Sequence, residues 1–170
     1  YFPDGFESQA EGAEKSGQDL IETIITMWRQ CELVSVEDPL HPSDLDGLRL
    51  LKEKISSVMD EIRNDDASTE LSYALRGVGA DSSCPLQVVA DEAVTSPESI
   101  KNWVDEAVFN TVKLRMSKTK TVTGAVNLAK AARQAGWQVI VGVEESSPES
   151  NDDFLGDLAV GVAACQFQGG

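Results

Sequence analysis

Short apolar segments alternate with amphipathic segments along most of this chain, and this alternation restricts the possible folds more than any other feature. The apolar segments read as strands at 33–37, 86–90, 110–114 and 137–143, with the start of a fifth at 166–168. The amphipathic segments read as helices at 16–31, 43–62, 96–106, 122–135 and 154–165. A basic turn at 115–120 connects the strand at 110–114 to the helix at 122–135. Apolar strands alternating with helices predict an α/β fold with one helix-covered parallel sheet. Ser16, Ser43 and Ser96 are the predicted N-caps of the first three helices.

Two architectures satisfy this order of elements. One is an open, doubly wound sheet of five strands, which would be complete in itself. The other is part of an eight-stranded β/α barrel, which the strands present here are too few to close. Both architectures place functional side chains at the carboxyl ends of the strands. The 170 residues suffice for one domain, and the irregular segment 64–85 is expected to be an insertion or excursion before the second strand.

Charged residues at the ends of three strands define the candidate site. Val34-Ser35-Val36 leads to Glu37 before Pro39 stops the strand, the second strand ends at Asp91, and the third carries Lys113. Acids and a lysine at the same ends of successive parallel strands predict a site for a hard cation with a general base beside it. In the structural alternative, Glu37 caps a turn and Lys113 is only an ion-pair partner of Glu37 or Asp91.

Composition excludes several classes of partner. The formal net charge is -15 and the pI is about 4.3, which argues against nucleic acid and membranes, because both need a basic face. A solvated acidic surface explains such a charge more often than a cation site does. Three cysteines without a short-spaced pair predict a reducing, cytoplasmic compartment rather than a disulfide framework. No glycine-rich phosphate fingerprint follows any strand, which argues against nucleotide binding.

The segments around the candidate site resemble the motifs of the enolase family. Residues 34–39 (V-S-V-E-D-P) resemble the S-I-E-D-P motif, residues 88–92 resemble V-V-G-D-D, and residues 112–114 resemble the L-L-K-V strand. Residues 136–141 resemble G-W-G-V-M-V, and residues 154–161 resemble F-I-A-D-L-V-V-G. These matches are collinear from about residue 18 to the end, whereas 64–85 has no obvious counterpart.

The resemblance implies the C-terminal (β/α) TIM-barrel domain of an enolase-like protein, incomplete over residues 1–170 because the N-terminal strands are missing. Enolases dehydrate 2-phosphoglycerate to phosphoenolpyruvate with two magnesium ions and a lysine base. By motif, Glu37 and Asp91 fall on metal-ligand positions and Lys113 falls on the catalytic base. The remaining metal-binding aspartate of the family would precede Tyr1, so Mg²⁺ binding is expected to be weak or absent in this fragment.

Four positions depart from the family pattern where substrate would bind. Val143 stands in place of a histidine, Glu144 in place of a phosphate-binding arginine, and Glu145 in place of a serine. Gln168 stands in place of a lysine that helps to hold the substrate carboxylate. A carboxylate facing a phosphate repels it, so the change at Glu144 reverses the interaction. His41 is a candidate local substitute for the histidine; its alternative is an exposed loop residue.

Two functions follow from these matches and departures. The first is a divergent enolase-like barrel domain with impaired catalysis, acting as a scaffold or interaction subunit, either as a homodimer or within a protein complex. Enolase-like proteins of cilia and sperm flagella extend this hypothesis, by analogy only, to a cytoskeletal location in the cytoplasm. The alternative is an active magnesium-dependent phosphopyruvate hydratase of glycolysis, or a related lyase of the enolase superfamily.

Overall fold

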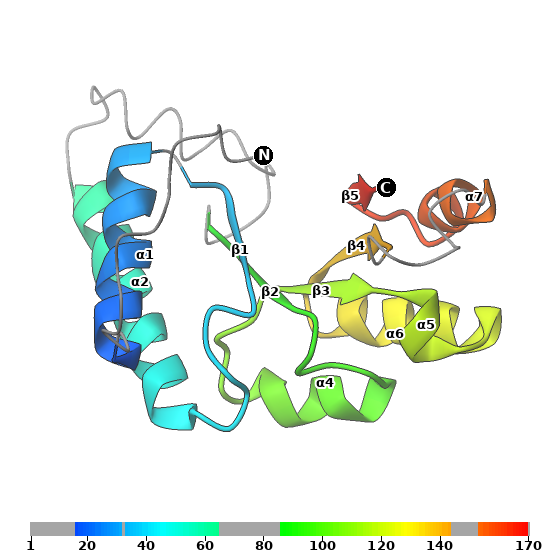
Figure 1. Ribbon diagram of the computed structural model, residues 1–170, viewed down its shortest axis with the longest axis horizontal. Helices are drawn as coiled ribbons and strands as arrows, with labels where there is room; N and C mark the ends of the chain where they lie inside the picture. Colours follow the sequence, from blue (N-terminus) through cyan, green and yellow to red (C-terminus); the bar gives the residue numbers. More distant parts are fainter. Residues whose placement is uncertain (1–15, 32, 65–85, 144–152, 170) are drawn as a thin grey trace, which may run out of the picture.

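The described residues of the computed structural model, 16–31, 33–64, 86–143 and 153–169, contain one parallel five-stranded sheet (Figure 1). The strands are β1 (Ser35–Glu37), β2 (Gln87–Ala90), β3 (Thr111–Leu114), β4 (Gln138–Gly142) and β5 (Gln166–Gln168). They lie in the order of the sequence, and every neighbouring pair is parallel. The predicted parallel α/β fold is confirmed. Each predicted strand is present, although four of the five are shorter than predicted.

Side-chain contacts between strands that are not neighbours show that the sheet is strongly curled. Gln87 on β2 donates through Nε2 to Oε1 of Gln138 on β4 at 2.6 Å. Gln166 on β5 donates to Oε1 of Gln87 at 3.0 Å. Neighbouring strands lie about 4.8 Å apart, so glutamine side chains three strands apart on a flat sheet, about 14 Å from each other, would not meet. The curl favours part of a barrel over the open doubly wound sheet.

Helices lie along the outer side of the curled sheet, which is open on its remaining side in Figure 1. They are α1 (Gly17–Cys31), α2 (Leu45–Asn64), α4 (Pro97–Val104), α5 (Met116–Thr119), α6 (Val122–Gln134) and α7 (Phe154–Gly161). One face of the strands joins the helices in a single apolar core, to which the strands contribute Val88, Ala90, Val112, Leu114, Val139 and Val141. Because side chains alternate along a strand, Val89 and Lys113 point to the opposite face, the interior of the barrel.

The helix starts follow local capping chemistry, with one correction. Ser16 accepts a hydrogen bond from the backbone N–H of Asp19 at 3.2 Å, and Ser96 forms a capping box at the start of α4, as predicted. The predicted cap at Ser43 is wrong. Oδ1 of Asp44 instead accepts from the backbone N–H of Gly47 at 2.9 Å, because α2 begins at Leu45 and Asp44 directly precedes it.

Two further differences concern short segments. The stretch predicted as a basic turn contains the four-residue helix α5, which ends where Lys120 adopts a left-handed φ of 61°. Helix α7 ends at Gly161 rather than at residue 165, because Ala163 has a φ of 44° and the backbone N–H of Cys165 already donates to Val139 of β4. Residues 65–85 lie outside the described residues, so the predicted insertion stays a prediction.

Candidate functional site

The three predicted site residues lie at one edge of the sheet. Glu37 is the last residue of β1, Asp91 directly follows β2, and Lys113 is the third residue of β3. The β2–β3 register pairs Ala90 with Val112, so Asp91 and Lys113 occupy the same level at the carboxyl end of the sheet. Parallel strands put their carboxyl ends at the same edge, which explains why the sequence spacing brings these residues to one end of the barrel.

Lys113 and Glu37 form an ion pair across β2. The Nζ atom of Lys113 donates to both carboxylate oxygens of Glu37 at 2.9 Å. The lysine side chain is 7% exposed, whereas that of Glu37 is 41% exposed. This is the contact that the structural alternative for Lys113 predicts. A general base must accept a proton from its substrate, and here the same nitrogen donates to a neighbouring carboxylate.

Asp91 has different cationic partners. Its Oδ2 atom lies 2.6 Å from Nη2 of Arg115, and its Oδ1 atom accepts from Nζ of Lys118 at 2.9 Å. Lys118 also donates to the backbone oxygen of Asp91 and to Oε1 of Glu92, each at 2.9 Å, and Arg115 reaches the same atom of Glu92 at 2.9 Å. The hydrogen bond from Lys118 lowers the pKa of Glu92. Asp91 is thus fixed in a network of two acids and two cations.

Asp38 ties the ends of β1 and β2 together, a role that the sequence analysis missed. It has a left-handed φ of 41°, and its backbone N–H donates to Val89 at 3.0 Å. Its two carboxylate oxygens accept the backbone N–H groups of Asp91 at 3.0 Å and Glu92 at 2.9 Å. The available signal was an acid placed directly before Pro39, since aspartate tolerates left-handed backbone better than most residues.

The positions that depart from the family pattern provide little to hold an anion. Val143 is a buried apolar side chain, and its backbone N–H donates to the carbonyl of Gln168 at 3.3 Å. The side chains of Gln168 and Lys113 both lie close to Gly142, because a Cβ atom there would be 3.4 Å from Oε1 of Gln168 and 2.7 Å from Cε of Lys113. Residues 144 and 145 lie outside the described residues, so their predicted effect on phosphate binding stays a prediction.

His41 is in an exposed loop, as its alternative predicts. Its Nδ1 atom lies 2.7 Å from Oγ of Ser43 and accepts the backbone N–H of Ser43 at 3.2 Å. It lines a surface hollow with Asp38 and Glu92, next to the charged end of the barrel. The contacts with Ser43 are local, and they hold the imidazole within its own loop.

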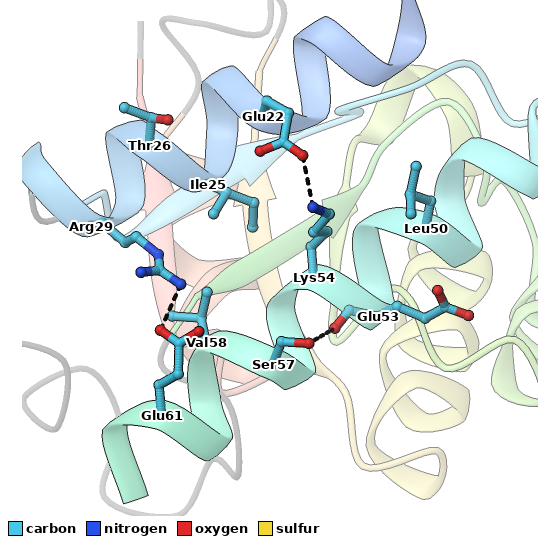
Figure 2. Close-up of a pocket in the computed structure, with 10 residues that line it drawn as sticks. All are labelled: Glu22, Ile25, Thr26, Arg29, Leu50, Glu53, Lys54, Ser57, Val58 and Glu61. Carbon is cyan, nitrogen blue, oxygen red and sulfur yellow. Dashed lines mark hydrogen bonds and ion pairs between the residues drawn. The ribbon is translucent and has the colours of Figure 1, made fainter. Parts of the chain in front are cut away.

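A second hollow lies on the outside of the barrel, between α1 and α2 (Figure 2). Ile25 and Val58 are buried beneath it. Two ion pairs cross from one helix to the other, Glu22 with Lys54 at 2.8 Å and Arg29 with Glu61 at 2.6 Å. Exposed pairs of this kind contribute about 0–1 kcal/mol each. The hollow is a groove in a helix–helix contact, remote from the charged edge.

The described residues do not fit a magnesium site. Both carboxylate oxygens of Glu37 and both of Asp91 already have a cationic nitrogen within 2.9 Å. Nowhere in the described ranges do three His, Cys, Asp or Glu side chains gather closely enough to hold a metal ion. Two unit charges about 4 Å apart interact by about 4 kcal/mol near a protein surface, and a divalent ion doubles that repulsion from each resident cation.

The curled parallel sheet and its charged edge define this chain as part of a (β/α) barrel with its polar residues gathered at the strand ends. The sequence model of a protein family described as "Enolase, C-terminal TIM barrel domain" matches residues 55–170, more than half of the chain. The chain therefore belongs to the enolase family. An enolase of Malacoplasma penetrans (strain HF-2) is 26% identical over 162 residues, covering 95% of this chain and 30% of that protein.

Proposed function

We propose that this chain is an enolase-family barrel domain with impaired catalysis that serves as a scaffold or interaction subunit. The observation that carries the proposal is the environment of Lys113. Its nitrogen donates to both oxygens of Glu37, and the neutral side chain of Gln168 lies close to Gly142, as that of Lys113 does. Lys113 occupies the position of the catalytic base but is held by a neighbouring carboxylate. In this arrangement it stabilises the edge of the barrel and needs no reaction to explain its presence.

Loss of substrate anchoring supports the same proposal. The buried apolar side chain of Val143 offers no charge or hydrogen bond to a phosphate, and Gln168 offers no positive charge. Glu144 and Glu145 add negative charge by sequence. Correct positioning of the reactants lowers an enzyme's activation barrier by about 7–11 kcal/mol. A general base contributes less than this, so a lysine base alone cannot compensate for the loss of phosphate binding.

The partners and location of the domain form part of the proposal. The net charge of -15 disfavours nucleic acid and an anionic membrane as partners, and the proposal names a protein partner or a second copy of the chain instead. Within the described ranges, no helix has the length and apolar character that crossing a bilayer requires. A cytoplasmic location, in a cilium or flagellum, rests on analogy with divergent enolase-like proteins. Weak or absent Mg²⁺ binding belongs to the same proposal.

A second candidate function is that of an active magnesium-dependent phosphopyruvate hydratase. One observation favours it: Glu37, Asp91 and Lys113, which the family motifs match to metal ligands and base, lie together at the carboxyl ends of β1, β2 and β3. The chain spans about 30% of the enolase relative that it matches, and other parts of a longer protein can contribute to a complete site.

Turnover of 2-phosphoglycerate by the full-length protein, coupled to detection of phosphoenolpyruvate, distinguishes the two functions. We expect no turnover above the enzyme-free reaction. A variant that combines Val143→His, Glu144→Arg, Glu145→Ser and Gln168→Lys restores the family residues, and it should gain turnover once Arg115→Gln and Lys118→Gln also let a metal ion reach Asp91. The matched control carries Asp46→Lys and Glu53→Lys in the same Arg115→Gln/Lys118→Gln background, raises the net charge equally on exposed positions of α2 and should gain none. Turnover by the unmodified protein would refute the proposal.

A further inference from the structure

We propose that Arg115 and Lys118 hold the place next to Asp91 that a divalent cation takes in a metal-dependent barrel, so that this edge keeps its structure without Mg²⁺. The inference rests on the proposed function and assigns two residues to it. Each residue contacts a different oxygen of the same carboxylate, Nη2 of Arg115 at Oδ2 and Nζ of Lys118 at Oδ1. The carboxylate is therefore neutralised from both sides by the protein itself.

Glu37, Asp38 and Asp91 lie at the carboxyl ends of β1 and β2, and each of their carboxylate oxygens has a hydrogen-bond donor. The oxygens of Glu37 accept from Lys113 at 2.9 Å, and those of Asp38 accept backbone N–H groups at 3.0 and 2.9 Å. The oxygens of Asp91 take the two cations at 2.6 and 2.9 Å. Magnesium is bound by carboxylate oxygens that it can approach directly, and each oxygen here is already engaged.

The network around Asp91 is sheltered from solvent and electrically balanced. The side chains of Asp91, Arg115 and Lys118 are 5%, 11% and 15% exposed. Glu92 supplies the second negative charge against the two cations. A divalent ion at Asp91 would have to displace two sheltered cations and leave them only the exposed carboxylate of Glu92, which is costlier than displacing water.

The short helix α5 and the contacts of its side chains fix the positions of Arg115 and Lys118, unlike those of mobile surface side chains. Arg115 is the residue that precedes α5, and Lys118 lies in the last turn of that helix. Lys118 uses all three donors of its ammonium group, on the backbone oxygen of Asp91, on its Oδ1 atom and on Oε1 of Glu92. The backbone N–H of Lys120 closes the helix on Met116 at 2.7 Å, which fixes the short segment that carries both cations.

The experiment measures metal binding separately from turnover, on the full-length protein. Mn²⁺ serves as the probe, with free Mn²⁺ followed by electron paramagnetic resonance up to about 10 mM, and melting temperatures are compared in EDTA and in Mg²⁺. We expect no saturable site that depends on Asp91, and equal melting temperatures. The double variant Arg115→Gln/Lys118→Gln should bind Mn²⁺ at least about tenfold more tightly than the wild type. Asp91→Asn in that variant should abolish the gain.

The control variant Arg49→Gln/Lys54→Gln removes two cations from α2 and changes the net charge equally, so it should leave Mn²⁺ binding unchanged. Wild-type binding that Asp91→Asn abolishes would overturn the inference. Such binding without turnover would overturn the weak Mg²⁺ binding but leave the proposed loss of catalysis standing, whereas turnover would refute the proposed function itself. A folded double variant that gains no binding would also overturn the inference. If the double variant fails to fold, the wild-type binding and melting data decide the outcome.

Discussion

Replacing Asp91 with asparagine tests whether its carboxylate is structural or is kept for an added cation. A carboxylate held ready for a missing metal is repelled by neighbouring acids, so neutralising it stabilises the protein. Asp91 instead has cationic partners at 2.6 and 2.9 Å, and its side chain is 5% exposed. Asparagine keeps the shape of the side chain but removes the charge that Arg115 and Lys118 share. We therefore expect Asp91→Asn to destabilise the barrel.

The size of the effect follows from burial and from the remaining partner. Removing one member of a buried ion pair costs about 3–5 kcal/mol. Glu92 stays 2.9 Å from both cations and still compensates them in part, so the lower end of that range, about 3 kcal/mol, applies. With a urea m-value of about 2 kcal/mol/M for a domain of this size, the unfolding midpoint should fall by about 1.5 M.

Urea-induced unfolding of the full-length protein, followed by tryptophan fluorescence, measures this change. Trp28 and Trp137 are buried in the apolar core and report on the barrel. The control is Glu61→Gln, whose side chain is 59% exposed and whose pair with Arg29 contributes about 0–1 kcal/mol. A midpoint for Asp91→Asn that equals or exceeds that of the wild type would refute the structural role of the carboxylate.

Two further predictions concern packing and pH. Gly142→Ala should cost about 1 kcal/mol in urea unfolding, because the new Cβ would be 2.7 Å from Cε of Lys113, and that side chain can shift only by straining its ion pair with Glu37. Gly156→Ala in α7 meets no atom within 4 Å and should add about 0.5–1 kcal/mol; equal stability of the two variants would contradict this reasoning. The hydrogen bond from Arg49 lowers the pKa of Glu106, so its contribution to stability is present above the ordinary value of 4.5 and is lost as pH falls through the lowered pKa. The melting temperature of Glu106→Gln should therefore fall less steeply than that of the wild type between about pH 5 and about pH 3, and parallel curves would contradict it.

The sequence predicted the strands and their parallel order because most of them are buried on both faces. All residues of β2 and β3 are buried, and such strands leave continuous apolar runs in the sequence. The curl of the sheet was beyond pattern analysis, because flat and closed sheets share the same alternation of strands and helices. It is visible only in contacts such as that between Gln87 and Gln166, which depend on three-dimensional proximity.

The placement of Glu37, Asp91 and Lys113 at one edge could be predicted, since strand ends determine it. The ion partners of Asp91 could not. Arg115 and Lys118 flank or belong to a helix of four residues, which is too short to show helical periodicity, so the segment was interpreted as a basic turn. Contacts made by side chains over a distance of 20 or more residues leave no local signal in a single sequence.

The position of Asp38 changes what a match to the E-D-P motif means for classifying proteins. Its carboxylate receives two backbone N–H groups of the next strand end, and its backbone adopts a conformation that few residue types tolerate. The aspartate of the motif therefore contributes to the strand junction, with or without a reaction. A match to this motif therefore indicates this strand junction and does not by itself indicate activity. Under the proposal made above, the residues that face Asp91 are the more informative positions, because an arginine and a lysine there oppose the binding of a metal.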